Sequence, residues 1–455
     1  MADRLPSSFR DPSGFVFRRD GILLRQINEP YRKDFELLMG SGLHDALASE
    51  GLLVKSVQEP TPDGVALLRP EVVPFISYPY EWSFSQLKDA ALLTLEVQRR
   101  SMEKNMSLKD ASAYNVQFVD GKPILIDTLS FEEYQEGKPW VAYRQFCRHF
   151  LAPLALMALT DVRLNGLLRQ DVDGVALDLT SHLLPGTTKL KPGLAVHIHL
   201  HAKSEGVSAG KSAGTEKVVT RTGLMGILDS LKGTLMGLDW SPTGTVWGDY
   251  YSDTNYTEAA MQSKRAIVSD ALQSVKSPNA SCWDLGANTG EFSRIAAGHG
   301  YPTIAWDMDP AAVEKGYRSV KEKGEKNLLP LLQDFANPSP SVGWGGEERG
   351  SLFQRGPADV AMALALIHHL AIGNNVPLPM IASFLARLGR YVIVEFVPKE
   401  DSQVHRLLAS RKDVFDEYAM PGWENAIEPL FETLGKWPVA ESKRTVYLLK
   451  ARREP

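Results

Sequence analysis

In the second half of the chain, short apolar runs alternate with segments whose apolar residues recur at helical spacing. This alternation is typical of a parallel β-sheet with helices on both faces. The predicted strands span residues 280–285, 303–306, 328–332, 360–366 and 391–396. A final hairpin, predicted around residues 437–439 and 445–449, would complete a seven-stranded α/β sheet.

The first half of the chain is poorer in strands. Residues 15–28 and 116–126 predict two β-hairpins, each around an Asp-Gly turn. Apolar positions at helical spacing predict helices over residues 31–50 and 83–103. We therefore expect an α+β domain over residues 1–202.

Gly, Ser and Lys dominate residues 203–217, which contain almost no large apolar side chain. Such a composition predicts a flexible linker. Residues 206–212 imitate a phosphate-binding P-loop, but the first glycine lies one residue too close to the lysine and no apolar strand precedes it. A P-loop is therefore not predicted.

Composition narrows the classes of partner. The formal net charge of −5 and the pI of about 6.1 give no basic field for nucleic acid. Cys147 and Cys282 are the two cysteines, too few for a disulfide framework and not spaced as zinc ligands. No apolar run reaches the length of a membrane span, and the start lacks the apolar core of a signal peptide. We expect a cytoplasmic protein without membrane or nucleic-acid partners, and the composition specifies no oligomeric state.

The densest chemical signal is the motif D-L-G-A-N-T-G over residues 284–290, a small-residue turn between a strand and a helix. Glycine lacks Cβ, so a ligand can lie against the backbone at this end of the strand. Asp307 ends the next strand, where a carboxylate can accept both ribose hydroxyls. Position 291 is Glu rather than the third glycine of dinucleotide sites, and Asp284 would repel a pyrophosphate. A cationic ligand is favoured.

This motif resembles the first motif of class I S-adenosylmethionine-dependent methyltransferases, except that Asn288 replaces the middle glycine. The resemblance covers about residue 280 to the C-terminus and implies a Rossmann-like sheet with S-adenosylmethionine as cofactor. We expect the methyltransferase domain over residues 276–455, behind a helical lead-in and cofactor cover at residues 218–275.

By the same resemblance, the turn at 284–290 holds the methionine moiety, Asp307 the ribose and Asp334 the adenine amino group. The predicted cofactor-binding residues are Asp284, Gly286, Ala287, Asn288, Gly290, Phe292, Asp307, Met308, Asp334, Phe335 and Leu364.

The fourth predicted strand ends in His368-His369, beside the expected methyl donor. Methyl transfer needs an oriented nucleophile and often a base with a pKa near neutrality. His369 is predicted to be that base, with His368 as the alternative; a purely structural cap on the strand end stays open. Glu395 ends the next strand and is expected on the same rim, either polarising a substrate or solvated. Paired histidines at this strand end resemble those of small-molecule methyltransferases.

Three aromatic residues are predicted to contact substrate. Trp344 lies in an insertion at residues 335–357 that is too long for an ordinary loop and could form a lid. Tyr250 and Tyr251 lie just before the methyltransferase core, where an N-terminal cover is expected. A place in the hydrophobic core is the alternative for such an aromatic cluster.

Asp110, Asn115 and Asp127 are spaced like the catalytic loop of protein and aminoglycoside kinases, which supplies a base and two metal ligands from one hairpin. No Gly-rich loop precedes them, and Arg25 stands where a strand lysine is expected. The spacing therefore indicates a degenerate kinase-like domain, with an accidental Asp/Asn hairpin as the alternative, and an active kinase is not predicted.

His197, His199 and His201 alternate in the sequence, so a strand would place all three on one face, as metal ligands could be. A helix would spread them around its axis. No acidic or cysteine partner is near in sequence, and no metal site is predicted.

The two-part layout resembles bacterial methyltransferases that are sometimes called nodulation proteins, through the segments at 78–98, 110–118 and 373–385. The resemblance implies an enzyme that methylates a small molecule or secondary metabolite, with the first half recognising substrate or partner. Two alternatives stay open. One is a non-catalytic pseudokinase–methyltransferase fusion that binds S-adenosylmethionine, and the other is a bifunctional enzyme that also uses ATP.

Overall fold

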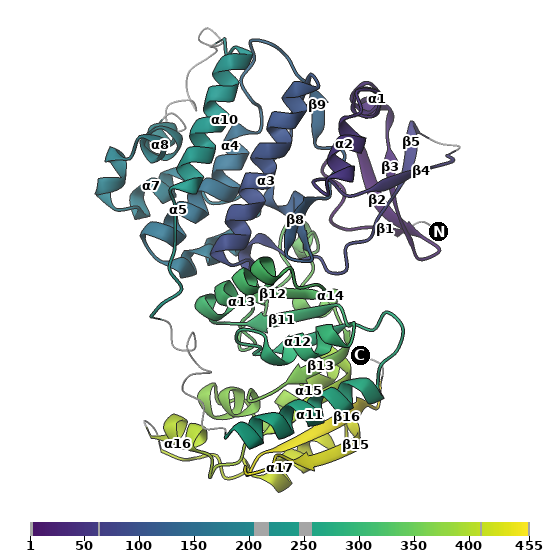
Figure 1. Ribbon diagram of the computed structural model, residues 1–455, viewed down its shortest axis with the longest axis vertical. Coiled ribbons are helices and arrows are strands. Elements are labelled where there is room, and N and C mark those ends of the chain that lie inside the picture. The colour runs from purple at the N-terminus through teal and green to yellow at the C-terminus, as the bar shows by residue number, and fades with distance from the viewer. Residues whose placement is uncertain (1–2, 62–63, 204–217, 245–256, 410–411, 454–455) are drawn as a thin grey trace. The chain divides into compact units, whose positions relative to one another are not determined.

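The computed structural model describes residues 3–61, 64–203, 218–244, 257–409 and 412–453. The chain forms two compact units (Figure 1). The first unit comprises Met1–Ser241 and Ser341–Arg349, and the second comprises Pro242–Pro340 and Gly350–Pro455. No helix among the described residues is both long and apolar enough to cross a membrane.

The first unit begins with an antiparallel five-stranded sheet in the order β1-β2-β3-β5-β4. Its strands are β1 (Asp3–Arg4), β2 (Gly14–Arg19), β3 (Ile22–Ile27), β4 (Ser56–Glu59) and β5 (Ala66–Pro70). The predicted helix at residues 31–50 is instead two helices, α1 (Arg32–Gly40) and α2 (Leu43–Ser49). The break falls at Gly42, whose φ of 72° is a left-handed conformation that glycine adopts without strain.

Helix α3 (Phe84–Glu103) confirms the predicted helix at 83–103. Ser83 and Gln86 form a capping box at its start, which pairs N–H groups that would otherwise lack a partner. The helix packs against two small antiparallel ladders. These ladders are β6 (Met106–Leu108) with β9 (Phe131–Glu133), and β7 (Val116–Val119) with β8 (Lys122–Leu125). The second ladder is the predicted hairpin at 116–126.

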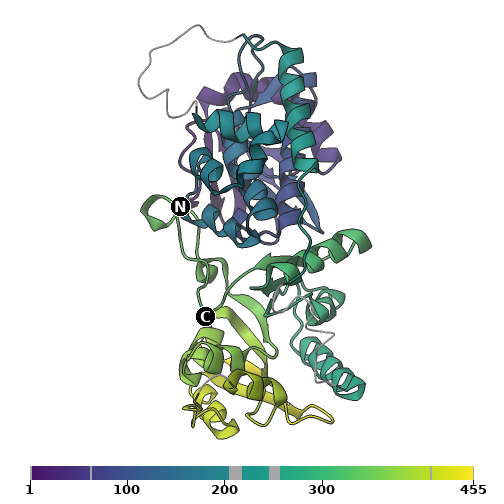
Figure 2. The same ribbon diagram turned by 90° about the vertical axis from the view of Figure 1, so that its left-hand side faces the viewer.

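The rest of the first unit is helical, and Figure 2 shows these helices grouped together. They are α4 (Tyr143–Phe146), α5 (Ala152–Leu159), α6 (Leu167–Gln170), α7 (Leu177–Leu183), α8 (Pro192–Leu194) and α10 (Arg221–Met236). Helix α10 packs against α3 and α8 through buried leucines. The expected lead-in at 218–275 is therefore divided, because α10 belongs to the first unit and α11 (Glu258–Ser274) to the second.

Of the alternating histidines, His197 and His199 lie on a π-helical turn, Ala195–Leu200, and His201 is the C-cap that follows it, so none of them lies on a strand. His197 exchanges hydrogen bonds with the Tyr143 hydroxyl at 2.7 Å and the Ser230 hydroxyl at 2.9 Å. His199 contacts two hydroxyls in the same way. The described residues contain no group of three or more His, Cys, Asp or Glu side chains arranged to hold a metal ion.

The second unit contains one seven-stranded sheet in the order β12-β11-β10-β13-β14-β16-β15. Its strands are β10 (Cys282–Leu285), β11 (Thr303–Asp307), β12 (Leu328–Leu332), β13 (Ala358–Ala363), β14 (Gly389–Phe396), β15 (Phe431–Pro438) and β16 (Thr445–Ala451). The first five are parallel, and β16 runs antiparallel to both of its neighbours. This topology confirms the predicted α/β methyltransferase sheet.

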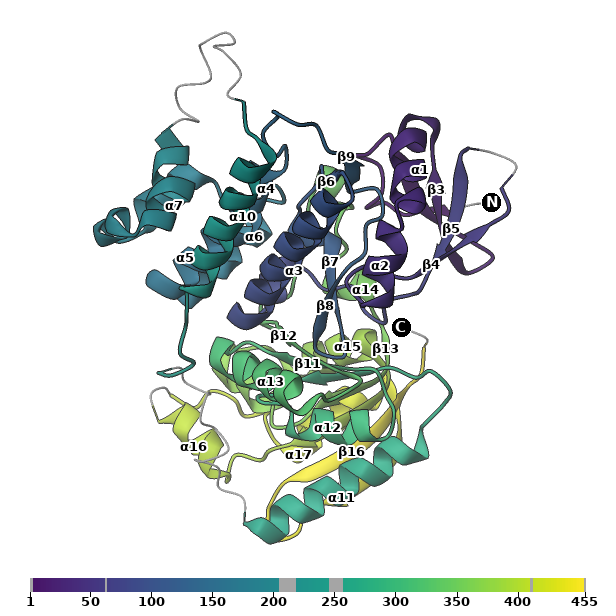
Figure 3. The ribbon, with the colours of Figure 1, turned by 45° about the horizontal axis from the view of Figure 1, so that its top comes forward.

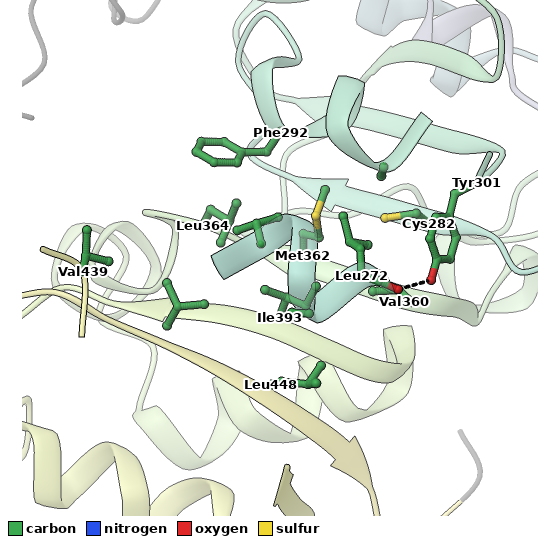
Figure 4. Close-up of a cluster of buried hydrophobic side chains, with 14 of the residues drawn as sticks. Leu272, Cys282, Phe292, Tyr301, Val360, Met362, Leu364, Ile393, Val439 and Leu448 are labelled. Atoms are coloured by element: carbon green, nitrogen blue, oxygen red, sulfur yellow. Dashed lines mark hydrogen bonds between the residues drawn. The ribbon is translucent and has the colours of Figure 1, made fainter. Parts of the chain in front are cut away.

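Helices cover this sheet, and Figure 3 shows α11, α12 and α13 along one side of it. The covering helices include α12 (Glu291–Gly298), α13 (Pro310–Lys323), α14 (Leu352–Arg355), α15 (Leu378–Leu388), α16 (Ser402–Leu408) and α17 (Met420–Ile427). Between α11 and the sheet lies a core of buried apolar side chains, including Met362, Val360 and Ile393 (Figure 4). The Tyr301 hydroxyl donates to the Leu272 carbonyl at 2.9 Å and satisfies its one polar group inside that core.

Candidate functional site

A pocket of about 250 Å³ lies at the carboxyl ends of the parallel strands in the second unit. This edge is where ligands bind in open α/β sheets, because the strands stop there and the following turns diverge. Residues from the ends of β10, β11, β12 and β13 line it. The predicted residues among them are Asp284, Gly286, Ala287, Asn288, Phe292, Asp307, Met308, Asp334, Phe335, Leu364 and His369.

The turn after β10 depends on left-handed backbone conformations. Gly286, Asn288 and Gly290 have φ angles of 78°, 51° and 89°. Asparagine tolerates this region better than most side chains, which explains how it replaces the middle glycine. Gly290 is absent from the pocket lining and forms the N-cap of α12 instead. Gly290, one of the predicted cofactor-binding residues, therefore shapes the turn and does not line the pocket.

Asp284, in β10, is 2% exposed, and its Oδ2 accepts a hydrogen bond from the Ser293 hydroxyl at 2.6 Å. Burial raises the pKa of this carboxyl to about 6, because removal from water disfavours the charged form. A cationic group in the pocket would oppose that shift and would be held by the carboxylate.

Asp307, the last residue of β11, joins two turns through its carboxylate. Its Oδ2 accepts the Asn288 N–H at 2.7 Å and its Oδ1 accepts the Asp309 N–H at 2.8 Å. Burial raises its pKa to about 6, despite these hydrogen bonds. A carboxylate offers about four lone-pair sites, so each oxygen can accept one further donor, such as a ribose hydroxyl.

The far end of the pocket combines a carboxylate with apolar side chains. Asp334 follows β12, and its Oδ1 accepts the Ala336 N–H at 2.8 Å. Phe335 and Leu364 line the same pocket, and Phe335 lies edge-on to Phe384 with ring centroids 6.1 Å apart. A flat aromatic ligand would find both a hydrogen-bond acceptor and apolar walls here.

The two histidines differ in their surroundings. His369 lines the pocket, whereas His368 is 1% exposed and its buried Nδ1 has no hydrogen-bond partner. Burial lowers the pKa of His369 to about 4, with a smaller contribution from the nearby Arg444 guanidinium. Burial also lowers the pKa of His368 well below its ordinary value. The geometry therefore favours His369 as the histidine that a ligand could reach.

Glu395 does not lie on the rim of the pocket, where its position at the end of β14 predicts it. It is fully buried and outside the pocket lining. Its Oε2 lies 2.8 Å from Lys264 Nζ, and its Oε1 lies 3.8 Å from the Arg444 guanidinium. Arg444 also pairs with Asp401 at 2.7 Å. The strand end is closed by a buried ion-pair network that removes Glu395 from solvent.

The sequence reasoning missed Lys264, which lies on α11 and lines the pocket. The signal was present, because Ala260, Lys264 and Val268 are one helical turn apart and all three are buried. A lysine within an apolar helical stripe rarely stays buried without a charged partner. Glu395 is that partner, and it lies more than a hundred residues away in sequence.

Of the three predicted substrate contacts, the structure describes Trp344 alone. Trp344 begins a short 3-10 turn, Trp344–Gly346, that belongs to the first unit, and it is 77% exposed. The segment around Trp344 is therefore part of the first unit. It does not belong to the second unit, which holds the cofactor pocket. Tyr250 and Tyr251 lie outside the described residues.

The first unit holds a second pocket, of about 340 Å³, that brings together Asp110, Asn115 and Asp127. The Arg25 guanidinium forms an ion pair with Asp127, whose other oxygen accepts the Ser130 hydroxyl at 2.6 Å. Burial, and secondarily the charge of Asp127, raise the pKa of Asp110. The three residues predicted from their spacing thus lie together in one pocket. Arg25 pairs with Asp127, a carboxylate that a metal ion would need.

The insertion predicted as a lid contributes to this second pocket through Glu348 and Arg349. Glu348 forms a bidentate ion pair with Arg10: Nε of Arg10 donates to Oε1 at 2.7 Å, and Nη2 donates to Oε2 at 2.8 Å. The Arg349 guanidinium lies over the Tyr114 ring, 4.4 Å from its centroid, and its buried Nε has no hydrogen-bond partner. Cationic, acidic and aromatic groups therefore meet in one pocket wall.

Three solved structures that align with the chain do so at low similarity. The kinase–methyltransferase WbdD aligns at a TM-score of 0.32 and 16% identity, over 45% of this chain and 43% of that one. Magnesium protoporphyrin IX methyltransferase from Synechocystis PCC 6803 gives 0.32 and 16%, over 45% and 91%. N-methyltransferase NodS from Bradyrhizobium japonicum WM9 gives 0.32 and 9%, over 43% and 98%. At these scores the likenesses assign no function to the chain.

Sequence comparison is more informative. No model of a known protein family matches the chain. Nodulation protein NoeA of Rhizobium meliloti (strain 1021) is 35% identical over 461 aligned positions, which cover 98% of this chain and 95% of that protein. Similarity over nearly the full length of both proteins includes both units described above. The chain belongs to the family of nodulation protein NoeA.

Proposed function

We propose that the protein is an S-adenosylmethionine-dependent methyltransferase that acts on a small molecule or secondary metabolite. One observation carries the proposal: Asp284, Asp307 and Asp334 lie at or just after the carboxyl ends of three adjacent strands and line a single pocket. Their spatial order suits the amino-acid end, the ribose and the adenine of one extended ligand. The glycine turn and the apolar walls at Phe335 and Leu364 fit the same ligand. Bound there, the cofactor would supply an electrophilic methyl group on a sulfonium.

His369 supports turnover rather than simple binding. Burial lowers the pKa of His369 to about 4, below the near-neutral value expected of a base, so its imidazole is neutral at physiological pH and a ring nitrogen can accept a hydrogen bond and, more weakly, a proton. Its place in the lining of the same pocket puts it within the site where an acceptor would lose that proton. We assign His369 as the base that orients and deprotonates the acceptor.

We further infer that the first unit recognises the substrate or a partner. Its pocket combines the Tyr114 ring, the Arg349 guanidinium and the buried Asp110 carboxyl, a mixture that suits a polar organic ligand. The Arg25–Asp127 ion pair argues against a nucleotide–metal site, because it neutralises one of the carboxylates that a metal would need.

The test is transfer of a labelled methyl group from S-adenosylmethionine to a small molecule in a cell extract. Transfer by the wild type and its loss in Asp307→Ala support the proposal. Tight cofactor binding without transfer to any component would favour the sensor alternative, and absence of binding would refute both. Once an acceptor is known, Arg349→Ala should raise its KM and leave cofactor affinity unchanged, with the exposed Arg19→Ala as control.

A further inference from the structure

We propose that Lys264 binds the carboxylate of the cofactor's amino-acid end, while Asp284 binds its ammonium group. The inference rests on the proposed function and adds a residue that neither the sequence motifs nor the comparisons assign. It makes the amino-acid subsite a matched pair of opposite charges contributed by different elements, α11 and β10.

The position of Lys264 supports this role. Its side chain is 3% exposed, yet it lines the pocket together with Asp284 and Gly286. Nζ lies 4.6 Å from the centroid of the Phe292 ring, which also lines the pocket. The ammonium group is therefore inside the site, at the end where the glycine turn leaves backbone exposed to a ligand.

Charge complementarity supports it as well. Lys264 and Asp284 are both buried; burial raises the pKa of Asp284 and lowers that of Lys264, and the charge of each residue partly opposes the shift of the other. A zwitterionic amino acid presents one cation and one anion a few ångströms apart. Two buried groups of opposite sign in one pocket can each take the complementary end, so both ionised groups of the ligand's amino-acid end are paired.

Glu395 acts as the positioning residue in this arrangement. An ammonium group carries three N–H donors, and the 2.8 Å contact with Glu395 directs one of them away from the ligand. Arg444 lies near Oε1 of Glu395, the carboxylate oxygen that Lys264 does not contact, and it also pairs with Asp401. The network thus holds Nζ of Lys264 against the end of β14, which lowers the entropic cost of ordering the lysine side chain when a ligand binds.

The test compares two ligands that differ by one group. Isothermal titration calorimetry measures the affinity for S-adenosylmethionine and for decarboxylated S-adenosylmethionine, which lacks the carboxylate. The wild type should bind the first about 10- to 100-fold more tightly, as expected for a charge-assisted hydrogen bond. Lys264→Met should lose that preference by weakening S-adenosylmethionine alone, with the affinity for the decarboxylated ligand nearly unchanged.

Two further variants separate a failure to fold from a failure of the idea. Lys264→Met leaves Glu395 buried with less compensation, so the double variant Lys264→Met/Glu395→Gln removes both charges together and should show the same loss of preference. Arg265→Met removes a cation from the next position of α11, where the side chain is 40% exposed and pairs with Glu291. It should behave like the wild type.

The outcomes are distinct. If the wild type binds neither ligand, the proposed function fails. If it binds both and the folded double variant keeps the wild-type preference, the methyltransferase proposal survives and the role of Lys264 is overturned. An equal loss for both ligands in the double variant would also overturn it, because a carboxylate contact cannot affect a ligand without a carboxylate.

Discussion

The carboxylate of Asp307 accepts the backbone N–H of Asn288 at 2.7 Å, which ties the end of β11 to the glycine turn after β10. The Asp307 carboxylate and the turn after β10 are therefore parts of one hydrogen-bonded framework. A change at Asp307 alters both the acceptor offered to a ligand and the shape of the turn that receives it.

Replacing Asp307 with Ala should weaken S-adenosylmethionine binding by at least about tenfold, because hydrogen bonds to a charged acceptor contribute roughly 1.5–3 kcal/mol each. Calorimetry measures the change. Asp307→Asn should be milder, since an amide oxygen can still accept one N–H. Glu322→Ala, an exposed acidic position on α13, is the charge-matched control. Equal affinities of Asp307→Ala and the wild type would remove Asp307 from the site.

Cofactor affinity should depend on pH through the buried carboxyls. Burial raises the pKa values of Asp284 and Asp307 to about 6. Above that pH both are carboxylates and bind the cationic ligand fully; below it they protonate, and affinity should fall by up to about tenfold per pH unit for each group. Binding measured between about pH 8 and 5 checks this. In Asp307→Asn the dependence should be shallower, and a flat profile in the wild type would contradict the shifts.

His369→Asn should lower kcat by about 10²–10⁴ and leave cofactor affinity nearly unchanged, because a base removed from a bound complex affects the transfer step. Since the pKa of His369 is about 4, wild-type activity should show no loss from its protonation down to about pH 5. Asparagine retains hydrogen-bonding capacity, so near-wild-type kcat would show that His369 only supports the backbone. His368→Asn tests the buried neighbour in the same assay.

The first unit should not hydrolyse ATP in the presence of magnesium. Arg25 pairs with Asp127, so binding a metal ion there would require breaking that ion pair. Phosphate release and nucleotide-induced shifts in melting temperature provide the measurements. Magnesium-dependent turnover that disappears in Asp127→Asn would establish the bifunctional alternative.

The sequence predicted the five parallel strands well because they are mostly buried and read as apolar runs. The edge strand β15 is largely exposed, and the sequence predicted a strand only around residues 437–439 where the structure has Phe431–Pro438. The cofactor-site positions came from the resemblance of the turn after β10 to methyltransferases and from where the following strands end. Glu395 shows the limit of that reasoning. The apolar run at residues 391–396 predicted that Glu395 lies near a strand end, but it could not show that Lys264 of α11 would lie beside it. Local periodicity also missed the left-handed break at Gly42, which a single backbone angle decides.

The segment Ser341–Arg349 belongs to the first unit, although the chain on both sides of it belongs to the second. The polypeptide therefore passes between the units three times, after Ser241, Pro340 and Arg349. Cutting the gene once near residue 241 would yield two incomplete fragments. The N-terminal fragment would lack the Glu348 that neutralises Arg10, and the C-terminal fragment would carry an orphaned hairpin. Neither unit can therefore be separated from the other by a single cut in the chain, and a fusion at one junction would not supply either unit complete.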